Sequence, residues 1–228
     1  MPNARILVID DEESILDLVT AYLEPEGYEV RTATDGRAGL DLARAFAPDV
    51  IVLDIMLPGM DGIELLAQLR RESDVYVIML TARTEETDKI VGLSVGADDY
   101  VTKPFSPREL AARVKAALRR IQGEAGPAES AVMAFQSLRI DPDARRLWVG
   151  DREVALTAVE FDLLKVLAEN HGRVLSREQL LQKVWGYEYF GDDRVVDVHV
   201  GHIRQKLGSD HFIVTVRGVG YRLEDEGA

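Results

Sequence analysis

The first 122 residues alternate short apolar runs with longer segments in which apolar residues recur at helical spacing. Residues 6–9, 50–53, 75–80 and 100–101 are unbroken apolar runs, and a further strand is expected around residues 28–30. Such runs are typical of strands that are buried on both faces of a parallel sheet. Strands separated by helices, with right-handed crossovers, predict an α/β fold with a doubly wound, five-stranded parallel sheet.

The helical segments predict which side chains cover this sheet. The first helix has apolar residues at helical spacing and is expected to bury Ile15, Leu18, Val19, Tyr22 and Leu23. The last helix of this half begins with a capping box at residues 106–109, with proline at its first helical position. Its predicted buried face consists of Leu110, Val114, Ala117 and Ile121.

The pattern changes at residues 123–131, which are small and polar and lack apolar periodicity. This composition predicts a flexible linker. The sequence therefore predicts two domains, at residues 1–122 and 132–228.

The second domain begins with short β-like pieces at residues 137–140, 147–149 and 154–156, separated by turn signals. Capping boxes at residues 157–160 and 176–179 then begin two helices. A third helix and a terminal hairpin follow. A sheet, three helices and a hairpin in this order predict an α+β winged-helix domain.

The third helix, at about residues 193–207, carries two different faces. The core face is predicted to consist of Val196, Val200, Ile203 and Leu207, which recur every three or four residues. The opposite face consists of Arg194, Val198, Gly201, His202 and Gln205, flanked by Arg204 and Lys206. A solvated face is the plain interpretation, but a glycine there costs the helix about 1 kcal/mol relative to alanine. A helix that enters a DNA major groove would use such a face, because small residues allow close approach.

Composition and charge limit the classes of protein. The chain has no cysteine, no signal-peptide core and no apolar run of about 18 residues, which indicates a cytoplasmic protein without disulfides or membrane spans. A net charge of −13 argues against a nucleic-acid partner. However, residues 1–122 carry 14 basic and 22 acidic side chains, whereas residues 130–228 carry 13 and 16, so the second half is nearly balanced.

Polar side chains gather where the predicted strands end. Asp54 follows one apolar run, and Asp10 and Asp11 follow another, so these carboxylates should meet at one edge of the sheet. A turn or cap is the alternative role for a lone Asp54. Converging carboxylates repel one another unless a cation shares them, and Mg²⁺ accepts such ligands. Thr81 and Lys103 add a hydroxyl and an ammonium, which predicts a metal-assisted phosphate site with Asp54 as the nucleophile.

Together these motifs resemble the receiver domain of two-component response regulators, with its flavodoxin-like strand order 2-1-3-4-5. The resemblance implies that Asp54 accepts a phosphoryl group from the phosphohistidine of a sensor histidine kinase. It implies that Asp10, Asp11, Asp54 and the backbone carbonyl of Met56 hold Mg²⁺. Lys103 would then contact the phosphoryl group, and Thr81 and Tyr100 would act as the switch.

The second domain resembles the DNA-binding domain of the OmpR/PhoB family in residues 196–199, 207–208 and 215–222. The resemblance implies a homodimer when phosphorylated, formed through a set of charged residues: Lys89, Asp98, Asp99, Glu109, Arg113 and Arg120. It also implies head-to-tail binding to direct repeats in promoter DNA and a loop, residues 187–192, that faces RNA polymerase. A solvated face is the alternative for the charged set.

The expected DNA contacts combine the helix and the hairpin. His202, Arg194 and Val198 would enter the major groove, where an imidazole can bond a base edge and valine can pack on a thymine methyl. Gly201, Arg204 and Gln205 lie on or beside the same face. Arg217 at the hairpin tip would reach an adjacent A/T-rich minor groove. It could instead be a solvated turn charge.

Two other functions remain open from the sequence. An enzyme that turns over a phosphorylated aspartate would need a further acid or base near Asp54, and the sequence supplies none at that edge. A winged helix that binds only proteins is favoured by the negative charge of residues 130–228. The residue patterns and the resemblance together predict a transcription regulator that is controlled by phosphorylation and is not a metabolic enzyme.

Overall fold

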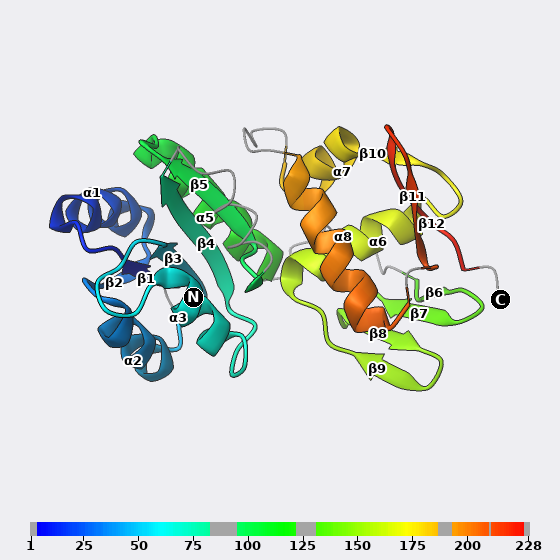
Figure 1. Ribbon diagram of the computed structural model, residues 1–228, viewed down its shortest axis with the longest axis horizontal. Helices are drawn as coiled ribbons and strands as arrows, with labels where there is room; N and C mark the ends of the chain where they lie inside the picture. The colour runs from blue at the N-terminus through cyan, green and yellow to red at the C-terminus, as the bar shows by residue number, and fades with distance from the viewer. Residues whose placement is uncertain (1–3, 83–94, 122–130, 187–192, 210, 226–228) are drawn as a thin grey trace. The chain divides into compact units, whose positions relative to one another are not determined.

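The structure is a computed structural model of the 228-residue chain, and it describes residues 4–82, 95–121, 131–186, 193–209 and 211–225. The chain divides into two compact units, Met1–Gln122 and Gly123–Ala228 (Figure 1). Most of the segment expected to be a linker, residues 123–130, lies outside the described residues. Among the described helices, none combines the length and the apolar character that a membrane span requires.

The first unit is a doubly wound α/β domain, as the sequence predicted. Its five strands pair in parallel in the order β2-β1-β3-β4-β5. The strands are β1 (Arg5–Ile9), β2 (Glu29–Ala33), β3 (Val50–Asp54), β4 (Tyr76–Ala82) and β5 (Asp99–Lys103). This order places β1 beside β3, so the residues that follow these two strands lie at one edge of the sheet.

Helices cover both faces of this sheet (Figure 1). They are α1 (Glu13–Leu23), the short 3-10 helix η1 (Glu24–Glu26), α2 (Gly36–Phe46), α3 (Gly62–Leu69) and α5 (Pro107–Ile121). Helix α1 contacts α5, and α2 contacts α3. Asp35 and Asp61 cap α2 and α3, because their carboxylates accept the backbone N–H groups of Ala38 at 2.8 Å and Glu64 at 2.7 Å.

Two of the predicted helix faces need correction. Helix α1 buries Leu16, Val19 and Leu23, whereas Leu18 is 41% exposed and Tyr22 is equally exposed. Most positions of this helix are apolar, so its spacing fits more than one stripe, and packing on the sheet and α5 selects one. Helix α5 buries Leu118 instead of Ile121, which is the last helical residue and lies partly in solvent.

The second unit has the predicted winged-helix composition (Figure 1). An antiparallel sheet has the order β6-β7-β8-β9, with β6 (Met133–Ala134), β7 (Leu138–Asp141), β8 (Arg146–Val149) and β9 (Arg152–Val154). The helices are α6 (Ala158–Glu169), α7 (Arg177–Val184) and α8 (Arg194–Leu207). A second sheet, ordered β10-β12-β11, consists of β10 (Leu175–Ser176), β11 (Ile213–Val216) and β12 (Gly220–Leu223).

Both predicted capping boxes are present. Thr157 and Glu160 exchange side-chain and backbone hydrogen bonds at the start of α6, and Ser176 and Gln179 do so at the start of α7. Helix α8 packs on α6 and α7 with its predicted core stripe buried. It ends at Gly208, whose φ of 78° is accessible to glycine at low cost.

The predicted strands of this unit differ in detail from the observed ones. The strand expected at residues 154–156 is β9, which begins two residues earlier, because the Gly150-Asp151 turn pairs Arg152 directly with Val149. The two-residue strands β6 and β10 are too short to give a period-2 pattern, and the sequence did not predict them. Asp225, near the end of the chain, accepts the N–H groups of Ser137 and Leu138, which ties the terminus to β7.

Candidate functional site

The predicted site residues of the first unit meet at the carboxyl edge of the parallel sheet. Asp54 is the last residue of β3, Lys103 is the last residue of β5, and Asp10 directly follows β1. Oxygen atoms of Asp10, Asp11 and Asp54 all lie within 4.8 Å of one another. Gly62 allows this edge to close, since a Cβ there would lie 2.0 Å from the backbone oxygen of Asp54.

The Lys103 ammonium joins the carboxylates. Its Nζ lies 2.8 Å from Asp10 Oδ2 and 2.9 Å from Asp54 Oδ2, and Glu12 Oε1 is 3.5 Å away. Asp10 and Asp54 are buried, whereas Asp11 and Glu12 are exposed. The other Asp10 oxygen accepts the Glu12 N–H at 3.0 Å. A single cation therefore holds two buried carboxylates, and the exposed Asp11 leaves one side of the cluster open to solvent.

The electrostatics of this edge favour a positive partner. Burial raises the pKa of Asp54, and the neighbouring Asp10 adds to this, while Lys103 and the Met56 N–H act in the opposite direction. Burial lowers the pKa of Lys103, but Asp10 and Asp54 outweigh it, so the pKa of Lys103 lies above its ordinary value. A further cation at this edge would stabilise the ionised form of Asp54.

The donor set fits Mg²⁺ by its chemistry. Three carboxylates from two neighbouring strand ends offer hard oxygen ligands on one open side, which is how proteins hold Mg²⁺ while leaving positions for water or phosphate. Met56 lies in the loop after β3 with its side chain 68% exposed. The role expected for its backbone carbonyl stays a prediction.

Thr81 and Tyr100 are both buried. The sequence placed Thr81 just after a strand, but it lies inside β4, opposite Thr102 and one residue beyond the Leu80–Asp54 pair. Tyr100 lies in β5 opposite Met79. The hydroxyl of Thr81 is thus one residue from the pair that includes Asp54, and the switch role of both residues stays a prediction.

Four of the charged residues expected at a dimer interface, Asp98, Asp99, Glu109 and Arg113, make ion pairs within one chain. Asp98 is buried and contacts Arg70 at 2.7 Å and the Val77 N–H at 2.9 Å. Arg113 is buried between Asp99, at 3.0 Å, and Glu109, at 2.8 Å.

The other two residues of this charged set are Arg120 and Lys89. Arg120 donates to the Tyr76 hydroxyl at 2.9 Å. Lys89 lies outside the described residues.

The carboxylate of Glu109, which was expected to cap α5, instead accepts a hydrogen bond from Arg113 one turn along the helix. Sequence reasoning missed Arg70, which directly follows the last residue of α3, because nothing in the sequence distinguishes it from its neighbour Arg71.

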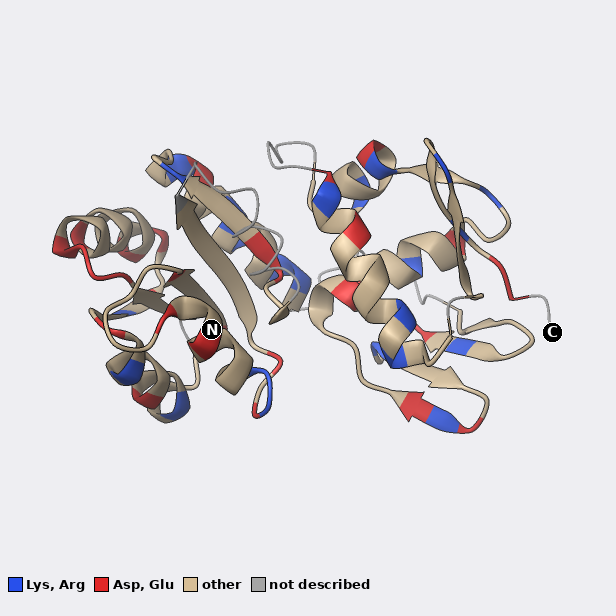
Figure 2. Ribbon diagram, in the orientation of Figure 1, with Lys and Arg blue, Asp and Glu red and all other residues tan. Residues whose placement is uncertain are grey.

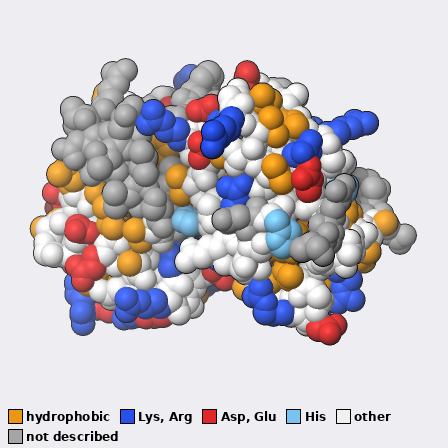
Figure 3. Space-filling model, turned by 45° about the vertical axis from the view of Figure 1, so that its right-hand side comes forward, with side chains coloured by type: hydrophobic (Ala, Val, Ile, Leu, Met, Phe, Trp, Pro, Cys, Tyr) orange, Lys and Arg blue, Asp and Glu red, His pale blue; other side chains and the backbone are white. Residues whose placement is uncertain are grey.

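The outer face of α8 is partly open. Arg194, Gly201 and Gln205 are exposed, and Val198 is half-buried. A Cβ on Gly201 would meet no described atom within 4 Å, so packing inside this unit does not require a glycine there. Along the ribbon of this unit, Lys and Arg positions are interspersed with Asp and Glu positions (Figure 2), and the face drawn in Figure 3 carries side chains of both signs, in keeping with the nearly balanced charge of this half.

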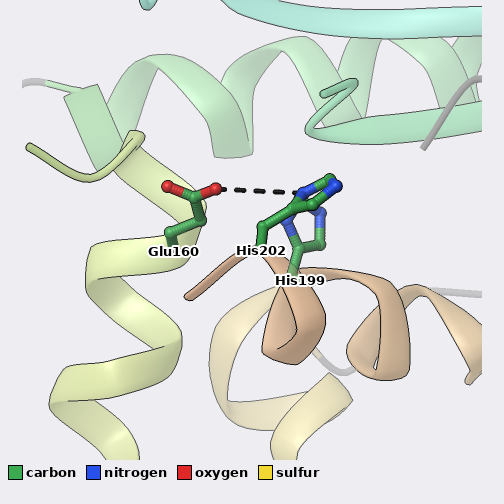
Figure 4. A group of neighbouring side chains, drawn as sticks. All are labelled: Glu160, His199 and His202. Carbon is green, nitrogen blue, oxygen red and sulfur yellow. Dashed lines mark ion pairs between the residues drawn. The ribbon is translucent and has the colours of Figure 1, made fainter. Parts of the chain in front are cut away.

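Two predicted DNA-contacting residues have partners inside the unit. Arg204 donates to the carbonyl of Ile213, through Nε at 3.0 Å, and to the Thr215 hydroxyl at 2.8 Å, so it supports the hairpin. The His202 side chain is 19% exposed and lies with Nδ1 3.9 Å from Glu160 Oε1, toward α6 (Figure 4). The apolar stripe could not show these contacts, because the sequence placed His202 on the opposite face of the helix and Arg204 beside that face.

The two glycines of the hairpin, Gly218 and Gly220, have different surroundings. Arg217 and Gly218 are exposed at the turn, and Gly218 has a φ of 73°. A Cβ on Gly220 would lie 2.0 Å from the Leu175 oxygen, so this glycine is needed for the pairing of β12 with β10. Of these two glycines, only Gly218 can therefore allow a binding partner to approach the backbone closely.

A partly buried hydrogen-bond network, which the sequence did not predict, fixes the hairpin to α8. Asp197 of α8 accepts from the Tyr221 hydroxyl at 2.7 Å and from Arg177 Nε at 2.6 Å. Burial and the bond to Asp197 raise the pKa of Tyr221 to about 12. The helix face and the hairpin are thus held in a fixed arrangement within this unit.

Comparison with known proteins matches both units. Residues 6–115 match the response regulator receiver domain family, and residues 151–223 match the family described as transcriptional regulatory protein, C terminal. The chain is 47% identical over 234 residues to the alkaline phosphatase synthesis transcriptional regulatory protein PhoP of Bacillus subtilis (strain 168), covering 98% of each chain.

Solved structures agree with this assignment. A cysteine-to-serine mutant of RitR matches with a TM-score of 0.74 and 29% identity, over 98% of this chain and 100% of that one. Response regulator DrrB of Thermotoga maritima, described as an OmpR/PhoB homolog, matches with a TM-score of 0.52 and 34% identity, over 98% and 100%. The chain is therefore a two-component response regulator of the OmpR/PhoB family, with a receiver domain followed by a DNA-binding domain.

Proposed function

We propose that this response regulator accepts a phosphoryl group on Asp54 and then binds promoter DNA as a dimer. The observation that carries the proposal is the position of Lys103 Nζ, 2.8 Å from Asp10 and 2.9 Å from Asp54, at an edge where three aspartates converge. A lone capping aspartate has no need of an ammonium group held directly against it. A phosphoacceptor does, because the same ammonium can bond the oxygens of the incoming group.

The transfer follows from these residues. An ionised Asp54 oxygen attacks the phosphorus of a kinase phosphohistidine, the new O–P bond forms as the P–N bond breaks, and the leaving imidazole takes up a proton. Asp10, Asp11, Asp54 and the Met56 carbonyl would hold Mg²⁺, which neutralises charge on the phosphoryl oxygens. Lys103 favours the ionised form of Asp54 before transfer, in opposition to the effect of burial on its pKa, and bonds the phosphoryl group afterwards.

The added group changes the charge at the sheet edge by roughly −1.5 to −2. Thr81 and Tyr100 would respond by shifting, which biases a receiver that already samples two states. Dimerisation through the charged set around α5 follows in this proposal, with the two winged helices docking head-to-tail on direct repeats. The sensor histidine kinase, promoter DNA and RNA polymerase are the proposed partners.

Phosphorylation is tested with a small phosphodonor and Mg²⁺, followed by mass spectrometry of the intact chain. The wild-type chain should gain one base-labile acyl phosphate, and Asp54→Ala should gain none. Asp17→Ala, which removes an exposed aspartate from α1, is the matched control and should behave as wild type. Asp11→Ala should lower the reaction by weakening Mg²⁺ binding. A phosphorylated Asp54→Ala chain would remove Asp54 from this role.

DNA binding is tested by selecting bound fragments from random duplex DNA, with and without phosphorylation. The selected sites should contain two direct half-sites, and retention should fall as salt rises, since phosphate contacts release counterions. Retention that does not depend on salt, or enrichment of no sequence by either form, would favour a winged helix that binds proteins.

A further inference from the structure

A second cluster of metal-ligand side chains lies in the winged-helix unit, far in sequence from the aspartates of the receiver. Glu160 is the third residue of α6, and His199 and His202 lie three residues apart on α8 (Figure 4). Each residue offers one ligand atom, and these atoms all lie within 4.8 Å of one another. Glu160 and His199 are buried, and His202 is partly exposed.

The fold positions each of these side chains. Glu160 Oε2 accepts the Thr157 N–H at 2.8 Å, as part of the capping box, and Lys206 Nζ lies 2.6 Å from the same oxygen. These contacts leave Oε1 toward His202 Nδ1, 3.9 Å away. The His199 ring packs against Trp185, with centroids 5.5 Å apart, and its edge contact with His202 has a centroid distance of 6.0 Å.

We propose that Glu160, His199 and His202 bind a divalent transition-metal ion of the zinc class. Two imidazoles and one carboxylate are ligands that Zn²⁺, Co²⁺ and Ni²⁺ accept, and a water can complete a tetrahedral site. Metal–ligand bonds of about 2.0–2.2 Å place ligand atoms roughly 3.4 Å apart, so side-chain rotation must draw the three atoms slightly closer. Mg²⁺ prefers oxygen ligands alone, so the receiver pocket and this site select different ions.

The bound ion would connect α6 to α8. Because its ligands are separated by about forty residues of chain, the site exists only in the folded unit, and binding stabilises that unit. The Lys206 ammonium, 2.6 Å from Glu160 Oε2, opposes a bound cation by its charge. The proposal concerns the DNA-binding unit alone and does not depend on phosphorylation of Asp54.

The test titrates the full-length chain, without a histidine tag, with Co²⁺ and then Zn²⁺ in a large excess of Mg²⁺ that occupies the receiver pocket. Tetrahedral Co²⁺ with nitrogen ligands gives strong visible absorption, and Co²⁺ beside Trp185 quenches its fluorescence. A Trp148→Phe background isolates the Trp185 signal, since the chain has two tryptophans. One ion per chain should bind, and Zn²⁺ should displace the Co²⁺ and raise the melting temperature.

Three variants and one control decide the assignment. His202→Gln changes a partly exposed residue and should weaken binding at least tenfold, as should His199→Gln. Glu160→Gln should do the same while preserving the cap, because glutamine also serves at this position of a capping box. His211→Gln, at an exposed histidine, is the control and should bind as wild type. Circular dichroism confirms that each variant is folded.

Two results would overturn the proposal. The first is metal binding by His202→Gln and Glu160→Gln with wild-type affinity. The second is binding that Asp11→Asn abolishes, which would place the ion in the receiver pocket instead.

Discussion

The two units hold their candidate functional residues in opposite ways. In the receiver, Asp10, Asp54 and Lys103 are mostly withdrawn from solvent and contact one another directly. In the winged helix, Gly201 and Arg217 are exposed. A hydrogen bond between two other residues, Tyr221 and Asp197, holds the hairpin against α8. Function and folding stability should therefore change together in the receiver, whereas in the winged helix they should separate.

The unit that unfolds can be identified by its spectroscopic signal. Both tryptophans, Trp148 and Trp185, lie in the second unit, so fluorescence follows the winged helix. Far-ultraviolet circular dichroism follows both units. A substitution that affects one unit alone can be recognised by comparing the two signals.

The largest effect is expected for Lys103→Met, which keeps the apolar stem and removes the charge. Asp10 and Asp54 then face each other without a cation, and breaking such a buried pair costs about 3 kcal/mol. Urea unfolding followed by circular dichroism should show this loss for the receiver and no change in the tryptophan signal. Lys115→Met, at an exposed lysine of α5, should change neither.

Two conditions sharpen this prediction. Added Mg²⁺ should recover more stability in Lys103→Met than in wild type, because it replaces the missing positive charge. The loss should also shrink at acid pH, since the crowded Asp54 carboxyl has a raised pKa and its neutral form tolerates burial. A receiver whose stability is unaffected by the substitution would show that the buried ion pair contributes nothing to folding.

The next effect is expected at Asp99 and Arg113, which are 3.0 Å apart and buried. Burial raises the pKa of Asp99 even beside this arginine, so the carboxylate depends on its partner. Arg113→Glu should cost the receiver about 3 kcal/mol by placing a third carboxylate beside Asp99 and Glu109. It should also weaken phosphorylation-dependent dimers, and adding Asp99→Arg should partly restore them, as measured by sedimentation.

The contact within one chain complicates that rescue. A double variant can restore the ion pair inside each subunit without any dimer contact. Mixing the two single variants removes this ambiguity, because an Arg113→Glu chain and an Asp99→Arg chain can complement each other only across an interface. Phosphorylated mixtures that dimerise no better than either variant alone would confine the pair to one subunit.

The sequence predicted most of the receiver because its signals are local. Each strand is a continuous apolar run, and each candidate residue lies at or near the end of one, so the parallel order brings Asp10, Asp54 and Lys103 together. The sequence could not predict which side chains of a helix are covered by its neighbours, because that depends on how the helix packs on the sheet. Leu18 and Tyr22 fit a helical stripe, yet the position of α1 on the sheet leaves them exposed.

The winged helix was predicted less completely for the same physical reason. The core stripe and both capping boxes are local patterns and were correct. The contacts of Arg204 with Ile213, of His202 with Glu160 and of Gly220 with Leu175 join residues that are distant in sequence and only tertiary packing brings together. The spacing of apolar residues along the sequence does not predict these contacts.

A smaller effect, of opposite sign, is expected for Gly201→Ala. The position is exposed in the interior of α8 and has open space around a new Cβ, so alanine should stabilise the winged helix by about 1 kcal/mol. If this face enters the major groove closely, the same substitution should lower DNA affinity. Tryptophan-monitored unfolding and binding to a selected operator measure the two effects.

Gly220→Ala is the matched contrast. Its Cβ would lie 2.0 Å from a backbone oxygen, so it should destabilise the unit instead. If both substitutions destabilised the unit equally, packing within the unit would constrain Gly201 on α8 as strongly as it constrains Gly220 in the hairpin.

The smallest effect on stability is expected for Arg217→Ala, because the side chain is exposed at the hairpin tip and such changes usually stay within about 0.5 kcal/mol. Its effect on binding should nevertheless be clear. Affinity should fall, the slope of log affinity against log salt should decrease by about 1, and any A/T preference beside each half-site should relax. Binding isotherms on the selected operator at several salt concentrations measure all three.

Two variants define what this result means. Arg146→Ala removes an exposed charge from β8, in the other sheet of the same unit, and should leave the salt slope unchanged. Gln205→Ala, which removes an exposed side chain from the outer face of α8, should instead change which bases are preferred within the half-site, by about 1 to 3 kcal/mol per lost contact. If Arg217→Ala binds like Arg146→Ala, with wild-type affinity and salt dependence, the hairpin does not contact DNA, and the exposed tip is a solvated turn. If Arg217→Ala reduces the salt slope and Arg146→Ala does not, Arg217 contributes to DNA binding without contributing to the folding stability of the unit.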